Sequence, residues 1–514
     1  MIRSTWGASP FGRAKRGTLK SLRVRTCIAN ATLGLTICLL FSSACSRVRS
    51  SSPAASAGSG ANVQAEGSGG RNRPEHQSKP YIVLVSFDGF RHDYLERGIT
   101  PNFERLSNGG ARADALIPVF PTKTYPNHYS IATGMYAGRH GIVANEFYDS
   151  GFDATYRIGD RSAVEDGRWY DGEPIWVTAE TQGMVTAAMF FIGTEAPVHG
   201  VQPTFWTRYQ HTLPNEERIK TVLNWLRMPS EQRPHLITLY FSVLDDAGHR
   251  YGPDAPQTLF AIREADALLG RLMAGLDSLP IGADVHLMIV SDHGMVRTDR
   301  GVRAMDNYTR FAAEDVVIVA GTIAQIHVRD PARRERIAYE LSRIPDTKTF
   351  LRDDLPLEWQ VRDNPRIGDV VVVADEGVLL VRRDDHPSQN QATHGYAPMP
   401  SMHGIFIASG PRIIPHTRIP AFENVHIYAL LAEILQLRPS PSIDGRLDVL
   451  RPILRPLQGR SERRSSDATM VRSACRQAEV AVQRSLSWGR LLRHPRMPTH
   501  FGASLDASSA QRPY

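Results

Sequence analysis

The strongest constraint on the fold is a set of short apolar runs, rich in β-branched residues, that lead into polar residues. They span residues 81–87 (YIVLVSF), 236–243 (LITLYFSV), 285–291 (VHLMIVS) and 404–409 (GIFIAS). Runs of this kind are typical of strands buried on both faces. Helical patterns lie between them at residues 216–226 and 256–279, and Thr100-Pro101 marks another helix start. Strands alternating with helices predict an α/β fold with a mostly parallel central sheet and helices on both faces.

The charge of the chain is unevenly distributed. The 514 residues are 42% hydrophobic, which excludes a disordered chain or a small disulfide scaffold, and the net charge is +7. Residues 1–80 carry twelve Lys and Arg against two Asp and Glu, and residues 451–514 carry twelve against four. The remaining 36 basic and 47 acidic side chains leave residues 81–450 at −11. We therefore predict no nucleic-acid-binding face on the body.

The two ends of the chain predict its domain organisation. Basic residues followed by a short apolar stretch make residues 1–45 a signal peptide, and Ser42-Ser43-Ala44-Cys45 resembles a lipoprotein cleavage site. Ordinary cleavage nearby and an uncleaved anchor are the alternatives. We expect an exported protein, periplasmic or tethered to the outer membrane in a bacterium and otherwise extracellular, with membrane contact only through this end.

The other predicted segments follow from composition. Residues 46–80 form a linker rich in Ser and Gly, residues 81–450 a folded domain, which the motifs described below identify as the catalytic domain, and residues 451–514 a basic, disordered tail. The alternative role of the tail is contact with acidic lipid or nucleic acid. Cys475 is the one cysteine outside residues 1–45, so we expect no internal disulfide and a monomer stabilised by its core.

Acidic residues and histidines follow three of the apolar runs. Asp88 follows the first, Asp245 and His249 follow the second, and Asp292 and His293 follow the third. Each Asp alone could simply end a strand in a turn. Together they predict a shared metal site at the carboxyl edge of the sheet, and carboxylate with imidazole suits zinc. Asp245 and His249 can reach one ion from a helical turn or from a compact loop.

A candidate nucleophile lies in the segment PTKTYPNHYS at residues 121–130. Pro126 is typical of the first turn of a helix, so Thr124 is expected at or just before a helix N-terminus. Such a Thr can be a simple cap. Beside a divalent ion, its hydroxyl can ionise and act as a nucleophile.

These residues also carry a family resemblance. The segments SFDGF (86–90), PTKTYPNHYS (121–130), HGIVANEFYD (140–149), DDAGHRYGP (245–253), SDHGM (291–295) and THGY (393–396) occur in one order. This set resembles the nucleotide pyrophosphatase/phosphodiesterase family of the alkaline phosphatase superfamily, from about Tyr81 to Leu450. The resemblance implies an alkaline phosphatase-like fold with a smaller inserted or capping region. It also implies two zinc ions and a nucleotide or other phosphodiester as substrate.

The resemblance further implies a role for each site residue. The first zinc would be held by Asp88, Thr124, Asp292 and His293, and the second by Asp245, His249 and His394. Thr124 would be the nucleophile that forms a phosphothreonine intermediate, and Asn145 would donate to a phosphate oxygen, although an ordinary loop Asn is the alternative. Tyr125 and Tyr209 would stack on the nucleobase. Tyr240, near the end of its run, is a further candidate for the rim of the substrate site.

The competing functions require different sequence motifs. Sulfatases need a C/S-x-P-x-R pattern, which the Thr124 segment lacks. A phosphomonoesterase needs extra cations, and Tyr125-Pro126-Asn127 offers none, although Lys123 is close enough in sequence to approach phosphate. A phosphomonoesterase and a phospholipase C-like enzyme remain alternatives. A non-catalytic binding protein would lack a ligand or the nucleophile. Val243-Leu244 replaces the Glu-Pro that the family often has before the Asp of its second zinc site, which affects the loop but no ligand.

Overall fold

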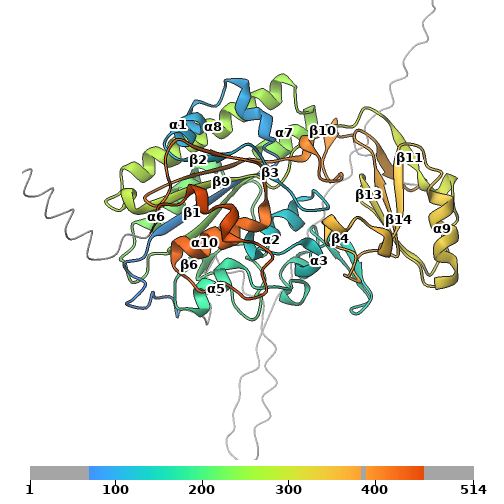
Figure 1. The fold of residues 1–514 in the computed structure, drawn as a ribbon, viewed down its shortest axis with the longest axis horizontal. Helices are drawn as coiled ribbons and strands as arrows, with labels where there is room; N and C mark the ends of the chain where they lie inside the picture. The colour runs from blue at the N-terminus through green and yellow to red at the C-terminus, as the bar shows by residue number, and fades with distance from the viewer. Residues whose placement is uncertain (1–68, 384–388, 457–514) are drawn as a thin grey trace, which may run out of the picture. The chain divides into compact units, whose positions relative to one another are not determined.

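The computed structural model describes residues 69–383 and 389–456 (Figure 1). The predicted signal peptide, residues 46–68 of the predicted linker and residues 457–514 of the predicted tail lie outside these ranges. In the described ranges, no helix is long and apolar enough to cross a membrane.

An eight-stranded sheet forms the centre of the described part of the chain. In spatial order its strands are β19 (Thr417–Ile419), β2 (Ala111–Ala113), β18 (Phe406–Ser409), β9 (Val285–Val290), β1 (Tyr81–Phe87), β8 (Leu236–Phe241), β6 (Thr186–Met189) and β7 (Phe205–Trp206). β1 is parallel to both of its neighbours, β8 and β9. β18 runs antiparallel to β9 and β2. The sheet is therefore mostly parallel, which confirms the predicted fold class.

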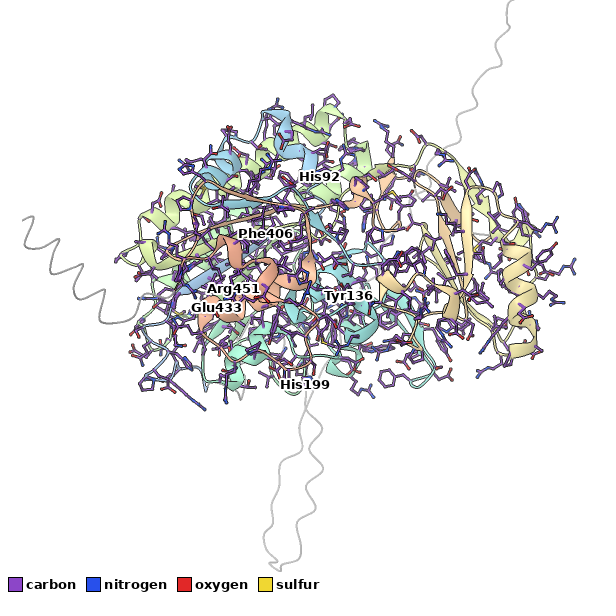
Figure 2. All side chains as sticks on the ribbon, in the orientation of Figure 1. His92, Tyr136, His199, Phe406, Glu433 and Arg451 are labelled. Atoms are coloured by element: carbon purple, nitrogen blue, oxygen red, sulfur yellow. The ribbon has the colours of Figure 1, made fainter. Side chains whose placement is uncertain are left out.

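Helices cover both faces of this sheet because its central strands are apolar on both sides. Val83 and Val85 of β1 pack with α1, α6 and α8, whereas Ile82 and Leu84 belong to the core that contains α2, α5 and α10. The helices are α1 (Pro101–Asn108), α2 (Thr124–Thr133), α3 (Ala137–His140), α4 (Arg161–Val164), α5 (Ile175–Thr181), α6 (Asn215–Leu226), α7 (Val243–Tyr251), α8 (Pro256–Asp277), α9 (Arg334–Leu341) and α10 (Ile427–Leu435). Phe406 of β18, labelled in Figure 2, is buried in this second core, with its ring 5.0 Å from that of Phe422.

The segment between β9 and β18 contains the expected smaller inserted region. Its antiparallel sheet has the order β12 (Val316–Val319), β13 (Ile323–His327), β15 (Val370–Ala374) and β14 (Thr347–Leu351), with α9 packed against β14 and β15. Short strand pairs are β10 (Val296–Arg297) with β17 (Ala392–Thr393), and β11 (Val302–Ala304) with β16 (Leu379–Val381). Further pairs elsewhere are β3 (Leu116–Ile117) with β20 (Phe422–Glu423), and β4 (Glu146–Asp149) with β5 (Ala154–Arg157).

Some predicted boundaries differ from the observed ones by a few residues. The second apolar run ends as strand at Phe241, because α7 begins at Val243. Residues 69–80, which the sequence assigns to the linker, pack on the body: Asn72 is 4% exposed, and its amide donates to the carbonyl oxygens of Ser230 and Arg233. Ile453, assigned to the tail, is buried in the core.

Candidate metal centre

Asp88, Asp292 and His293 meet at one end of the central sheet because they follow adjacent parallel strands. β1 and β9 run side by side with Ser86 opposite Val290, so the residues that follow both strands reach the same edge. The three side chains are at most 1% exposed. His293 Nε2 lies 3.4 Å from Asp88 Oδ1 and 3.0 Å from Asp292 Oδ2. The structure thus brings the predicted first group of ligands together.

Asp245, His249 and His394 form a second group beside the first. Asp245 lies in the first turn of α7 and His249 one turn later, so a helix, and not a compact loop, directs both side chains to one place. His394 follows β17 and comes from a distant part of the sequence. Asp245 Oδ1 is 3.5 Å from His249 Nε2 and 3.7 Å from His394 Nε2. Asp245 also lies close to Asp88 and His293, which makes the two groups neighbours.

Backbone carbonyl groups set the orientation of the three imidazole rings. The Nδ1 atoms of His249, His293 and His394 lie 2.9, 2.9 and 3.0 Å from the carbonyl oxygens of Ala392, Gly294 and Thr122, respectively. A carbonyl oxygen can only accept, so each Nδ1 carries a hydrogen and each Nε2 is left to face the carboxylates. With the hydrogen on Nδ1, the Nε2 atom of a neutral ring has a lone pair that can bind a cation. This is how proteins orient histidine ligands of zinc.

The buried carboxylate oxygens are a second feature that fits bound cations. Asp88 Oδ1, Asp245 Oδ1 and Asp292 Oδ2 are buried and accept no hydrogen bond from the described residues. Buried polar atoms are normally satisfied, so unpaired oxygens in one place call for an ion. Burial raises the pKa of Asp88 well above its usual value, and the Asp292 and Asp245 carboxylates raise it further. The residues therefore fit one or more divalent cations.

Thr124 is the first residue of α2 and lies against the first group, with its Oγ1 3.2 Å from His293 Nε2. Asn145 approaches from the loop before β4, and its Oδ1 accepts the backbone N–H of Tyr125 at 3.0 Å. This bond leaves the Asn145 amide NH₂ directed elsewhere. The first N–H groups of a helix have no acceptor within the helix, so the N–H of Thr124 can donate to an anion.

The three predicted aromatic residues lie in different environments. Tyr125 is half-buried, and Tyr209 is 36% exposed with its ring 5.8 Å from that of Tyr240. Tyr240 is buried, and its hydroxyl donates to Asp88 Oδ2 at 2.5 Å. The structure therefore places Tyr240 behind a metal-ligand candidate, at the floor of the site. Its position at the end of β8, beside β1, brings the hydroxyl to Asp88.

His128 contacts the site directly and is not among the site residues predicted from the sequence. Its ring is fully buried, with Nδ1 2.9 Å from the Thr124 carbonyl oxygen and 3.4 Å from Asp292 Oδ2. Its Nε2 lies 2.7 Å from Ser86 Oγ. The available signal was its spacing, because a residue four positions after Thr124 lies on the same face of a helix.

An open cavity of about 660 Å³ lies next to Asn145. Its lining includes Lys123, Glu146, Arg157, Ile158 and Asp160. Glu146 and Arg157 pair with each other at 2.9 Å, so neither charge is left alone in the cavity. The cavity gives a substrate room beyond the atoms that contact Asn145.

The fold and this centre place the protein among the alkaline phosphatase-like α/β proteins with clustered Asp and His ligands. Residues 82–397 match the family described as type I phosphodiesterase/nucleotide pyrophosphatase. The chain belongs to this family.

Known proteins resemble the chain in sequence and in structure. A venom phosphodiesterase from Crotalus durissus collilineatus is 34% identical over 76% of this chain and 48% of its own length. Ectonucleotide pyrophosphatase/phosphodiesterase family member 3 from Mus musculus is 35% identical over 71% of this chain and 43% of its own. The chain therefore spans about half the length of these relatives. Murine ectonucleotide pyrophosphatase/phosphodiesterase 5 is similar in structure with a TM-score of 0.69 and 29% identity, covering 73% of this chain and all of that chain. An inactive threonine-to-alanine variant of the same murine protein was solved in complex with AMP.

Proposed function

We propose that this protein is a two-zinc nucleotide pyrophosphatase/phosphodiesterase that releases a nucleoside monophosphate through a phosphothreonine intermediate. The observation that carries the proposal is the position of Thr124 at a helix N-terminus, 3.2 Å from His293, beside buried carboxylate oxygens that accept no hydrogen bond within residues 69–383 and 389–456. Asp88, Asp292, His293 and Thr124 would hold the first zinc. Asp245, His249 and His394 would hold the second. When bound, two zinc ions would lower the pKa of Thr124 and of the hydrolytic water and offset the phosphate charge.

The residues of the chain supply attack and orientation. Thr124 Oγ forms a bond to phosphorus while the bond to the leaving oxygen breaks, and water later hydrolyses the phosphothreonine. The Thr124 N–H and the Asn145 NH₂ can donate to the nonbridging oxygens, where negative charge collects in the transition state. The hydrogen bond from Tyr125 N–H to Asn145 Oδ1 holds the amide in this orientation.

The substrate is a nucleotide diester or pyrophosphate. Tyr209 offers an exposed ring and Tyr125 a half-buried one, and flat rings accept any base. The murine neighbour solved with AMP supports a nucleotide ligand. Diesters also need room for a second substituent on phosphorus, and the open cavity at Asn145 provides it. Lys123 donates to two backbone carbonyl oxygens, which weakens the case for a phosphomonoesterase in which Lys123 binds the phosphate.

Substrate comparison tests the proposal. We expect kcat/KM of the zinc-loaded protein to be highest for a nitrophenyl ester of a nucleoside monophosphate, followed by nitrophenyl phosphate and a choline lipid. Thr124→Ala should abolish turnover and leave the zinc content near two per chain, because six other ligands remain. Thr221→Ala is the matched control, because Thr221 is a half-buried Thr on α6 whose hydroxyl donates to the Glu217 carbonyl oxygen of its own helix. A preference for the monoester or the lipid, or turnover retained by Thr124→Ala, would contradict the proposal.

We further propose that residues 1–45 direct export, with lipidation at Cys45 as one outcome, that 46–68 act as a linker, that 69–456 form the catalytic unit and that the protein is a monomer. Venom enzymes among the relatives support an exported protein. Fractionation of bacteria that express the chain and its Cys45→Ser variant tests this. A lipoprotein moves from the membrane to the soluble fraction on substitution, whereas cytoplasmic retention of both would contradict export.

A further inference from the structure

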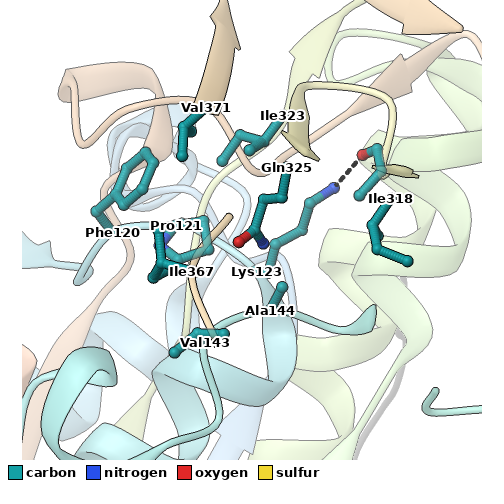
Figure 3. A pocket seen from close by; sticks show the side chains of 11 residues that line it. Phe120, Pro121, Lys123, Val143, Ala144, Ile318, Ile323, Gln325, Ile367 and Val371 are labelled. Carbon is teal, nitrogen blue, oxygen red and sulfur yellow. Dashed lines mark hydrogen bonds between the residues drawn. The ribbon is translucent and has the colours of Figure 1, made fainter. Parts of the chain in front are cut away.

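Lys123 is a buried cation next to the nucleophile. Its side chain is 8% exposed, and Nζ donates to the carbonyl oxygens of His394 at 3.0 Å and Ala320 at 3.2 Å; Figure 3 shows the bond to Ala320. No carboxylate of the described residues pairs with this ammonium group. Burying an unpaired ammonium costs free energy, which the two carbonyl bonds offset only in part. The burial of the Lys123 ammonium group therefore points to a role that a neutral side chain could not fill.

A glycine at position 395 leaves the space that the Lys123 side chain occupies. Gly395 has a φ of +105°, and a Cβ at this position would lie 2.1 Å from Lys123 Cε. Any other residue at position 395 would therefore displace the lysine. This close approach is independent of the hydrogen bonds at Nζ, and it ties Lys123 to the segment that carries His394.

Thr122 binds the same segment from the other side. Its carbonyl oxygen accepts from His394 Nδ1 at 3.0 Å. Its hydroxyl accepts from the Gly395 N–H at 3.1 Å and donates to the Tyr396 carbonyl oxygen at 2.8 Å. With the Lys123–His394 bond, four hydrogen bonds join residues 122–123 to residues 394–396. We name this set the 122–123 clamp.

The clamp joins two parts of the centre that the chain separates widely. Thr124 follows it directly, and His394 is a ligand candidate of the second group, whose other members lie on α7. Lys123 also reaches Ala320, in the turn between β12 and β13, so the inserted sheet contacts the centre at this point. The clamp therefore sets the distance between the nucleophile and the second group.

We propose that Lys123 is a positioning residue that holds His394 in place for the second zinc ion. The inference rests on the proposed two-zinc function. Removing the Nζ donors frees the His394 carbonyl group and lets the ring move away from α7. Residues that orient a zinc ligand typically account for about 10- to 100-fold in metal affinity. The first group shares none of the clamp bonds, although the His293 ring stacks on the His394 ring with 3.5 Å between ring centres, so the zinc affinity of the first group should change less than that of the second.

Zinc binding by the Lys123→Met variant tests the clamp. Met keeps most of the stem and removes the donors. With free zinc set by a chelator buffer and bound zinc measured by mass spectrometry, we expect the second zinc to bind at least about tenfold more weakly and the first to lose less affinity than the second. kcat should fall at low free zinc and recover as zinc rises, with KM changed less than about threefold. Lys79→Met is the matched control, because Lys79 Nζ also bonds to a carbonyl oxygen, that of Gln436, but outside the centre.

Thr122→Val is the second variant, and it decides the matter if Lys123→Met does not fold. It removes the Thr122 hydroxyl from the clamp and keeps the shape of the side chain. It should weaken the binding of the second zinc ion as Lys123→Met does. If the wild type binds two zinc ions and the folded variants bind both with wild-type affinity, the clamp proposal is overturned alone. If the wild type binds fewer than two, both the clamp and the two-zinc function fail. A loss of thermal stability equal with and without zinc, at unchanged zinc affinity, would reduce Lys123 to a structural role and also overturn the proposal.

Discussion

The contact between Tyr240 and Asp88 makes a sharp prediction, because it separates a role in metal binding from one in substrate binding. Tyr240→Phe removes one hydroxyl that donates to Asp88 Oδ2 at 2.5 Å inside a buried site. A hydrogen bond to a charged group contributes about 1.5–3 kcal/mol. The donor stabilises Asp88 as a carboxylate, which is the form that binds a cation, so the loss falls mainly on the metal-bound state. The lower figure, about 1.5 kcal/mol, corresponds to about tenfold weaker zinc binding at the first group.

The assay is zinc content at buffered free zinc, together with KM for a nucleotide nitrophenyl diester. We expect Tyr240→Phe to lower zinc affinity about tenfold and to leave KM within about twofold, because the hydroxyl points at Asp88. Tyr209→Phe is the control: it removes the hydroxyl of a neighbouring tyrosine that contacts His211 at 3.1 Å. A several-fold rise in KM with unchanged zinc affinity would refute the reasoning and place Tyr240 at the substrate rim.

Three further predictions concern phosphate, base and pH. Asn145→Ala should lower kcat by about 10²- to 10³-fold with little change in zinc content, because it removes one donor to the transition state. Single-turnover rates measure this loss, and an unchanged kcat would contradict the role of Asn145. Tyr209→Ala should lower kcat/KM for nucleotide esters by about 5- to 150-fold, the range of one stacked base, and spare bis-nitrophenyl phosphate; an equal loss on both substrates would argue against stacking. Burial lowers the pKa of His140 to about 3, so the unfolded state takes up a proton below about pH 6.5 that the folded state refuses, and stability falls as pH falls. Between pH 7 and 5 this amounts to about 2 kcal/mol, and urea unfolding of His140→Gln should show a pH dependence smaller by that amount; an unchanged slope would contradict the assignment.

The sequence predicted much of the site because adjacent parallel strands bring their carboxyl ends to one edge. Asp88 and Asp292 follow apolar runs that are recognisable as buried strands, so their meeting followed from fold class. His394 could be chosen only through the family resemblance, because it follows no such run. The role of Tyr240 was also out of reach. Strand periodicity gives the face of a residue, whereas the partner of its hydroxyl depends on which strand lies alongside.

Local chemistry determined the elements and the ligand types of this protein: buried strands from apolar runs, a helix start at Thr124 and a supply of Asp and His at strand ends. Tertiary structure alone decided how these groups act together. It placed His394 against the Thr122 carbonyl group, set Lys123 into the space left by Gly395 and directed the Tyr240 hydroxyl to Asp88. The physical reason is the distance along the chain over which each kind of interaction acts. Helix and strand signals act over a few residues, whereas the orientation of a ring or the pairing of a buried charge depends on groups that are up to about 270 positions away.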